Sequence, residues 1–236
     1  MAEARGPEER ALEKLYLLLE AEAGFGLDRL PAPWLGETRD REAALRALAA
    51  RAEACRACGL WRGRRRLVFG EGNPAPRLLF VGEGPGREED RVGRPFVGRA
   101  GALLDRMIRA MGFTRGEVYI ANAVKCRPPE NRTPTAEEME ACRPLLEEQI
   151  RILRPRVIVA LGAPAARTLL KREEGITALR GRAHPYPGDE GIPVVPTFHP
   201  AYLLRKEREK PKAWVDLQLA LSLLAGTGDP GSGPRG

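Results

Sequence analysis

The stretch Leu78-Leu-Phe-Val-Gly-Glu-Gly-Pro-Gly86 is a short apolar run followed by a glycine-rich turn. Further apolar runs occupy Val118–Val124, Val157–Leu161 and Ile192–Val195. Short apolar runs of this kind indicate strands that are buried on both faces. Strands covered in this way predict a parallel sheet inside the protein.

Helical patterns lie between these runs. The first places apolar residues on one helix face: Leu103, Leu104, Met107, Ile108 and Met111. A second opens after Pro134 with the capping-box pair Thr135 and Glu138 and extends to about Leu153, and a third begins at Gly162. Alternating strands and helices predict an α/β fold with helices on both faces of the sheet.

Composition places the chain among ordinary globular proteins. Of its 236 residues, 43% are hydrophobic and 30% are charged. No apolar run approaches the roughly 20 residues that cross a bilayer. The first residues lack the apolar centre of a secretory signal, so we expect no membrane association and a cytoplasmic location.

The net charge of +7 and a pI near 9.6 suit a polyanionic partner such as nucleic acid. The alternative is a solvated, arginine-rich surface without such a partner.

Four cysteines form the pattern Cys55-x-x-Cys58, Cys126 and Cys142. Thiols stay reduced in the cytoplasm, which favours a metal or cluster over two disulfides. The alternatives are a zinc site in a nucleic-acid-binding protein without catalysis, and a redox pair formed by Cys55 and Cys58.

In a parallel sheet the segments that follow the strands meet at one cleft. After the first strand, Glu83 is positioned to orient or activate a water molecule, unless its loop is only a connection. Phe96, between Gly93 and Gly98, offers a stacking face for a planar ring or, alternatively, anchors the loop to the core.

Two further strand ends carry polar side chains. Asn122 can read a pyrimidine edge, and the nearby Lys125, Arg127 and Arg132 suit phosphates, although strand termination and solvated cations are the alternatives. His199 follows the last strand and is a stronger candidate than His184, which we expect in a loop. Leu203 and Leu204 beyond it either wedge into a base stack or face the core of a short helix.

We expect three regions along the chain. Residues 1–50 form a helical N-terminal extension with an apolar stripe near residues 12–19, and a helix over Asp40–Ala54 delivers Cys55. Residues 51–225 form the catalytic domain, and residues 226–236 form a disordered tail.

Together these motifs resemble the family-4 uracil-DNA glycosylases, the iron–sulfur branch of their superfamily. The resemblance covers about Cys55 to Leu224 and rests, besides the four cysteines, on these segments: Gly82–Gly86, Gly93–Gly101, Asn122–Pro129 and His199–Arg205.

The resemblance implies a three-layer α/β/α sandwich around a four-stranded parallel sheet. It implies hydrolysis of the N-glycosidic bond of uracil in single- or double-stranded DNA, by a monomer that flips the base out. It also implies a [4Fe–4S] cluster bound by Cys55, Cys58, Cys126 and Cys142. Residues 1–50 are not covered, and we expect either a helical appendage or an element that binds an unknown partner.

The resemblance also assigns roles to single residues. Phe96 stacks on uracil, Asn122 binds its edge, and His199 faces the uracil oxygen on which charge develops. Glu83, with the backbone of Gly82 and Gly84, positions the water. The expected DNA contacts are Lys125, Arg127, Leu203, Leu204 and Arg205.

Two departures from related patterns matter. The family's usual first motif has alanine where this chain has Gly84, which loosens the loop but keeps the carboxylate. A related branch traps the sugar covalently through a histidine on a basic insertion, and no such insertion precedes His199. We therefore expect a hydrolase.

Overall fold

The computed structural model describes residues 33–226, and the side chains from residue 38 onward. The expected apolar stripe near residues 12–19 and the tail after Gly226 lie outside these described residues. Within residues 33–226, no helix is both long enough and apolar enough to cross a membrane.

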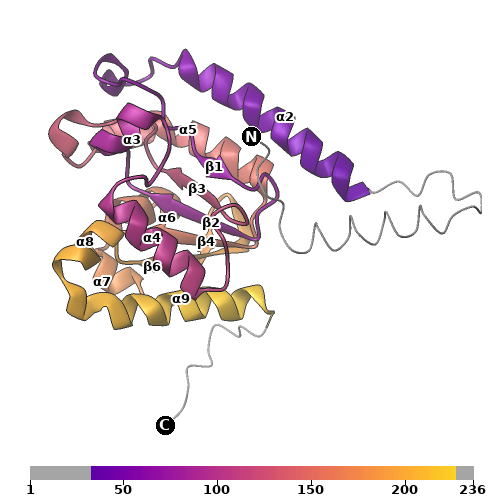
Figure 1. The fold of residues 1–236 in the computed structure, drawn as a ribbon, viewed down its shortest axis with the longest axis vertical. Coiled ribbons are helices and arrows are strands. Elements are labelled where there is room, and N and C mark those ends of the chain that lie inside the picture. Colours follow the sequence, from indigo (N-terminus) through magenta and orange to yellow (C-terminus); the bar gives the residue numbers. More distant parts are fainter. Residues whose placement is uncertain (1–32, 227–236) are drawn as a thin grey trace, which may run out of the picture.

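A six-stranded sheet in the order β1-β3-β2-β4-β6-β5 forms the centre of the molecule (Figure 1). Its strands are β1 (Glu71–Gly72), β2 (Leu78–Gly82), β3 (Tyr119–Asn122), β4 (Val157–Leu161), β5 (His184–Tyr186) and β6 (Asp189–Thr197). The four inner strands are parallel to their neighbours, whereas β1 and β5 pair antiparallel at the two edges. The expected strands are all present, but the expected total of four is corrected to six, because the edge strands are too short for a sequence pattern.

Helices connect the strands: α2 (Pro33–Glu53), α3 (Arg87–Val92), α4 (Arg99–Ala110), α5 (Ala136–Leu153), α6 (Ala163–Leu170), α7 (Ile176–Leu179), α8 (Pro200–Arg205) and α9 (Lys210–Leu224). Short 3-10 turns are η1 (Gly59–Arg62), η2 (Pro129–Asn131) and η3 (Glu207–Glu209). The predicted capping box is confirmed, since Thr135 and Glu138 each accept a hydrogen bond from the other's backbone amide at the start of α5. The three predicted helices correspond to α4, α5 and α6.

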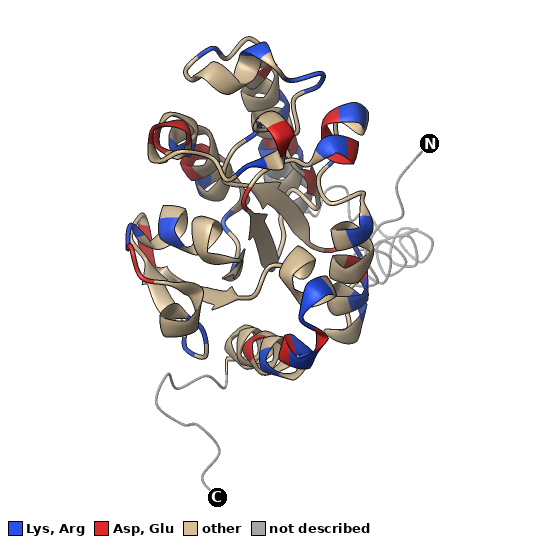
Figure 2. Cartoon of the chain, turned by 90° about the vertical axis from the view of Figure 1, so that its left-hand side faces the viewer, with Lys and Arg blue, Asp and Glu red and all other residues tan. Residues whose placement is uncertain are grey.

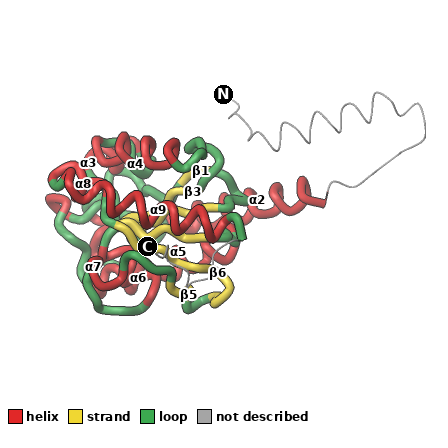
Figure 3. The backbone as a smooth tube through the Cα atoms, turned by 90° about the horizontal axis from the view of Figure 1, so that it is seen from below, coloured by secondary structure: helices red, strands yellow, loops and turns green. Residues whose placement is uncertain are grey.

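The sheet separates two hydrophobic cores. Alternate residues of a strand point to opposite faces, so Leu79 and Val81 pack toward α2, α5 and α6, while Leu78 and Phe80 pack toward α4, α8 and α9. Figure 3 shows α4 and α6 on opposite sides of the strands. Helices therefore cover both faces, as the alternation of strands and helices predicts.

Helix α2 packs into the same core as the sheet. Its Leu45 and Leu48 are buried, and Arg41 donates a hydrogen bond of 3.0 Å to the carbonyl of Leu153 in α5. The helix begins earlier than the predicted Asp40. The division expected after residue 50 falls inside this helix.

Candidate active site

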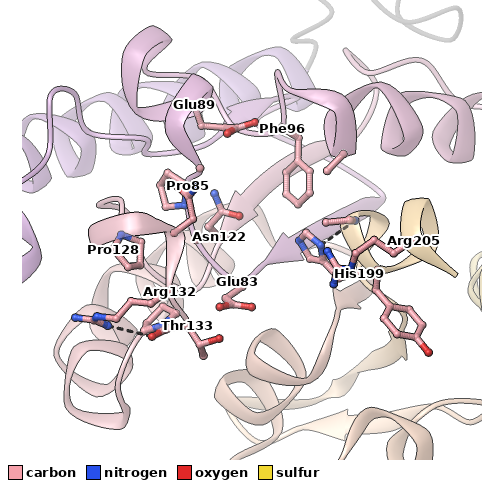
Figure 4. Close-up of a pocket in the computed structure, with 17 residues that line it drawn as sticks. Glu83, Pro85, Glu89, Phe96, Asn122, Pro128, Arg132, Thr133, His199 and Arg205 are labelled. Atoms are coloured by element: carbon pink, nitrogen blue, oxygen red, sulfur yellow. Dashed lines mark hydrogen bonds between the residues drawn. The ribbon is translucent and has the colours of Figure 1, made fainter.

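A cleft of about 510 Å³ lies at the carboxyl ends of β2, β3 and β6 (Figure 4). Seven residues singled out from the sequence line it together: Glu83, Gly84, Phe96, Asn122, Arg132, His199 and Arg205. They come from segments that are far apart along the chain, and the parallel sheet brings them to one edge. The predicted cleft is therefore present.

Asn122 ends β3 directly opposite Gly82 in β2. Its side chain is only 1% exposed, and among the described residues its Oδ1 has no hydrogen-bond partner. A Cβ atom on Gly82 would lie 2.5 Å from this oxygen and 2.6 Å from Cζ of Phe96. The missing side chain at Gly82 therefore leaves room for both the amide and the ring.

Phe96 adopts a left-handed backbone conformation, with φ of 50°. This conformation is costly for a residue with a large side chain and persists only where the surroundings enforce it. Glu89 does so, because its Oε1 accepts hydrogen bonds from the amides of Val97 at 2.9 Å and Gly98 at 3.0 Å. Arg115 donates to the carbonyl of Pro95 on the other side. The ring is thus held in place from both flanks.

Glu89 lies in the cleft wall, in α3, and was not among the predicted site residues. Glu89 belongs to an acidic run in the first turn of α3, where carboxylates are common because they interact favourably with the helix dipole. The sequence therefore gives no reason to single it out. Its hydrogen bonds to a loop eight and nine residues later give no signal in the sequence.

His199 is the N-cap of α8, and its Nδ1 accepts a hydrogen bond of 3.1 Å from the amide of Ala201. The proton of the neutral ring is therefore on Nε2. Burial, and then the positive charge of Arg205, lower the pKa of His199 to about 4. Its ring centroid lies 5.7 Å from that of Phe96. The site thus holds a neutral imidazole with an N–H to donate.

The carboxyl group of Glu83 faces the same space (Figure 4). Burial raises its pKa, and a hydrogen bond from the side chain of Thr133 opposes that shift. Its backbone carbonyl accepts a hydrogen bond of 3.1 Å from the amide of Val124, which attaches the loop to the segment after β3. A carboxylate in this position can bind water or oppose a positive charge.

Lys125 is buried, which does not suit the predicted contact with DNA phosphates. Its side chain is 1% exposed, and its Nζ donates a hydrogen bond of 2.8 Å to the carbonyl of Asn122 and another to Gln149. Burial lowers its pKa to about 8. The lysine is therefore an internal support of the β3 end.

Leu203 is also unavailable as a wedge, because it is 1% exposed and packs in the core with α4 and α9. Leu204 is only partly buried, and Arg205 is exposed at the cleft. Arg127 is half-buried and donates a hydrogen bond of 2.7 Å to Asn131.

His184 is not among the described residues that line the cleft. It lies in β5 rather than in the expected loop, and its Nε2 is 2.8 Å from the carbonyl oxygen of Leu179.

The four cysteines line one small cavity, together with Trp61 and other residues. The amide of Lys125 donates to Sγ of Cys142 at 3.3 Å, and Arg64 donates to Sγ of Cys126 at 3.3 Å. Within the described part of the chain, no three or more His, Cys, Asp or Glu residues are arranged to hold a single metal ion. The thiols thus converge on one place without closing around one ion.

Comparison of the sequence with known proteins identifies relatives of this chain. The Uracil DNA glycosylase superfamily matches residues 69–218 of the chain. A type-4 uracil-DNA glycosylase of Thermotoga maritima is 48% identical over 187 residues, which cover 78% of this chain and 96% of that protein. Those of Sulfurisphaera tokodaii and Pyrobaculum aerophilum are 45% and 46% identical, over 64% of this chain and 71% and 80% of their own lengths.

The protonation state of His199 can be measured by NMR, because the chain has only two histidines. In the variant His184→Asn the remaining imidazole signals belong to His199. We expect His199 to remain neutral, with its proton on Nε2, until the pH approaches 4. Since this pKa lies below the unfolded value near 6.5, the unfolded chain binds the proton first. The free energy of unfolding should therefore decrease as the pH falls from about 6.5 to about 4. A proton on Nδ1, or titration near 6.5, would contradict this assignment.

Proposed function

Because the chain belongs to the uracil DNA glycosylase superfamily, we propose that this cleft removes uracil from DNA. The chain is a monofunctional glycosylase: it hydrolyses the bond between the base and the sugar, releases uracil and leaves an abasic site. One observation carries the proposal for the site. The unpaired Oδ1 of Asn122 is buried in a cleft beside the ring of Phe96.

Recognition follows from the chemistry of the amide. Uracil presents an N–H donor at N3 and an acceptor at O4, which pair with the oxygen and the NH₂ group of Asn122. Cytosine presents the opposite pattern at these atoms. The base must leave the helix to reach the cleft, which costs a few kcal/mol and favours a base that is mispaired or already unpaired. Phe96 offers the flipped base a stacking surface.

The reaction moves charge in two directions. As the bond between C1′ and N1 breaks, its electron pair goes to uracil, and negative charge develops on O2. The Nε2–H of His199 is suited to donate a hydrogen bond to that oxygen, and no proton has to be lost or gained beforehand. The sugar becomes cation-like and is attacked by water, whose oxygen bonds to C1′. The carboxylate of Glu83 is suited to orient that water and to accept its proton.

The cysteine cavity fits a [4Fe–4S] cluster. In such a cluster each thiolate binds a different iron atom, so the four sulfurs do not crowd around one ion as they do around zinc. Four cysteines that line one cavity supply the ligand set of such a cluster. Arg64 and the amide of Lys125 donate hydrogen bonds to the sulfur atoms of Cys126 and Cys142, which stabilises the thiolate form of these cysteines. When bound, the cluster cross-links residues 55–58 to residues 126–142, and the hydrolysis needs no electron from it.

Contacts with DNA follow from the rim of the cleft. Arg205 is exposed beside His199, and Arg127 lies next to the loop over η2, so both can reach phosphates. Leu204 is the remaining candidate to fill the gap left by the flipped nucleotide.

The activity can be tested with a labelled oligonucleotide that contains one uracil, followed by alkaline cleavage of abasic sites. The wild-type protein should yield strand breaks at the uracil, and Asn122→Ala should lower the single-turnover rate at least about 100-fold, because buried donors and acceptors then stay unpaired. Arg156→Gln, just before β4 at the opposite end of the sheet from the cleft, should retain the wild-type rate. Absence of strand breaks with folded wild-type protein would refute the proposed function.

Gly82 and Gly84 form a matched pair for testing the geometry. Gly82→Ala would place a Cβ against Asn122 and Phe96, so we expect a loss of activity of roughly 100-fold or more. At Gly84 the nearest atoms to an added Cβ belong to Val124, at 2.7 Å, Pro128 and Pro134, and none belongs to Asn122 or Phe96. Because related motifs have alanine at this position, Gly84→Ala should stay within about threefold of wild type. Equal effects of the two substitutions on the single-turnover rate would contradict our description of the cleft.

The metal centre is tested by elemental analysis and visible absorption of anaerobically purified protein. We expect about four iron atoms per chain, a brown colour and no stoichiometric zinc. Replacing any one of the four cysteines by alanine should reduce the iron content and the thermal stability. Cys55→Ala and Cys142→Ala form the decisive comparison, since a redox pair at Cys55 and Cys58 would leave metal content independent of Cys142.

A further inference from the structure

The segment Cys55–Leu67, here called the arginine loop, is the most concentrated positive region of the described chain. It includes η1 and carries five arginines: Arg56, Arg62, Arg64, Arg65 and Arg66. No aspartate or glutamate occurs between Ala54 and Gly70. Neighbouring guanidinium groups repel one another, so such a segment gains stability when an anion binds to it.

Arginines elsewhere commonly have carboxylate partners. Arg51 pairs with Glu148 at 2.6 Å, and Arg132 pairs with Glu138 at 2.7 Å. Among residues 38–226, by contrast, no arginine of the arginine loop forms an ion pair with a carboxylate. Arg64 is hydrogen-bonded to Cys126 and to backbone carbonyls, and Arg66 donates to the carbonyl of Val92 at 3.3 Å. The guanidinium groups of the other three arginines have no hydrogen-bond acceptor among the described residues.

Two of these charges are held in place by an aromatic ring. The guanidinium carbons of Arg56 and Arg62 lie 4.9 Å and 5.4 Å from the centroid of Trp61. Trp61 itself lines the cysteine cavity, so it is fixed to the rest of the protein. A guanidinium that contacts a ring through its face keeps its N–H groups in one plane, free to bind phosphate oxygens.

The arginine loop is attached to two segments that lie beside the cleft. The amide of Val68, just after the loop, donates to the carbonyl of Lys125 at 2.9 Å, near the end of β3. The amide of Arg65 donates to Asp90 at 2.8 Å, in the same helix as Glu89. Figure 2 looks onto this side of the molecule and shows Lys and Arg in the loop at the top of the view. The positive charges of the loop therefore lie beyond α3, on the side of the cleft that Glu89 lines.

We propose that the arginine loop binds the phosphates of the DNA strand on one side of the flipped nucleotide. Arg56, Arg62 and Arg65 make these contacts, several nucleotides away from the uracil, and so increase affinity without reading sequence. The inference rests on the proposed function, because it takes the cleft as the place where the nucleotide is bound.

The test compares the triple variant Arg56→Gln/Arg62→Gln/Arg65→Gln with the control Arg151→Gln/Arg154→Gln/Arg156→Gln. The control removes the same charge near the start of β4, at the opposite end of the sheet from the cleft. Binding to undamaged double-stranded DNA is measured by fluorescence anisotropy as a function of salt. The loop variant should bind roughly tenfold more weakly at low salt. The slope of log K against log salt is negative, and its magnitude should be smaller by about 0.9 for each phosphate that the variant no longer neutralises.

Two further measurements separate the possible outcomes. At saturating DNA the single-turnover rate of uracil release should be unchanged in the loop variant. On oligonucleotides shortened on one flank of the uracil, the loop variant and the wild type should bind equally well. An unchanged salt slope in a folded variant with full visible absorption would overturn the inference, whereas wild-type protein that binds DNA but releases no uracil would overturn the proposed function alone.

If the triple variant loses its visible absorption, Arg65→Gln decides the question. The guanidinium of Arg65 is hydrogen-bonded to no described residue, so its removal leaves the cysteine cavity intact. A salt slope that is smaller in magnitude by about 0.9 supports the inference, and an unchanged magnitude overturns it.

Discussion

The absence of a side chain at Gly82 is the constraint on which the cleft depends. Gly82 is the last residue of β2 and pairs with Asn122 at the end of β3. The amide of Asn122 and the ring of Phe96 both occupy the space that a Cβ at this position would need. Parallel pairing sets the two strand ends side by side, and the glycine lets side chains from two different segments converge there.

A second constraint links the cysteine cavity to the cleft. The backbone amide of Lys125 is bonded to Cys142, while its side chain is bonded to the carbonyl of Asn122. The segment from Asn122 to Cys126 is therefore fixed at both ends. A buried ammonium group is costly unless it is paired or hydrogen-bonded, and here Gln149 and the nearby thiols provide that compensation. Structural support of the cleft thus begins at the cysteines, which is a role that requires no redox chemistry.

Sequence patterns predicted the elements whose signal is local. The inner strands, the capping box of α5 and the cleft residues Glu83, Phe96, Asn122 and His199 could be found, because each belongs to a continuous run or motif. Lys125 and Leu203 were assigned to the surface because charge and apolarity do not indicate direction; their burial depends on Gln149 and on α9, which are distant in sequence. The edge strands β1 and β5 and the contacts of Glu89 were missed for the same reason, since they exist only through tertiary pairing.

The rigid cleft and the arginine loop have separate tasks, because the cleft recognises the base and the loop binds the strand. Phe96 is held in an unfavourable backbone conformation by Glu89, so the stacking surface is in place before any base arrives. A preformed pocket loses little entropy when the base enters, but it cannot by itself remove that base from the helix. Extrusion costs a few kcal/mol, and this cost is lowest for a base that is mispaired or already unpaired. Phosphate contacts by the arginine loop would increase the affinity for the strand without changing that cost, while Asn122 and His199 remain dedicated to the base.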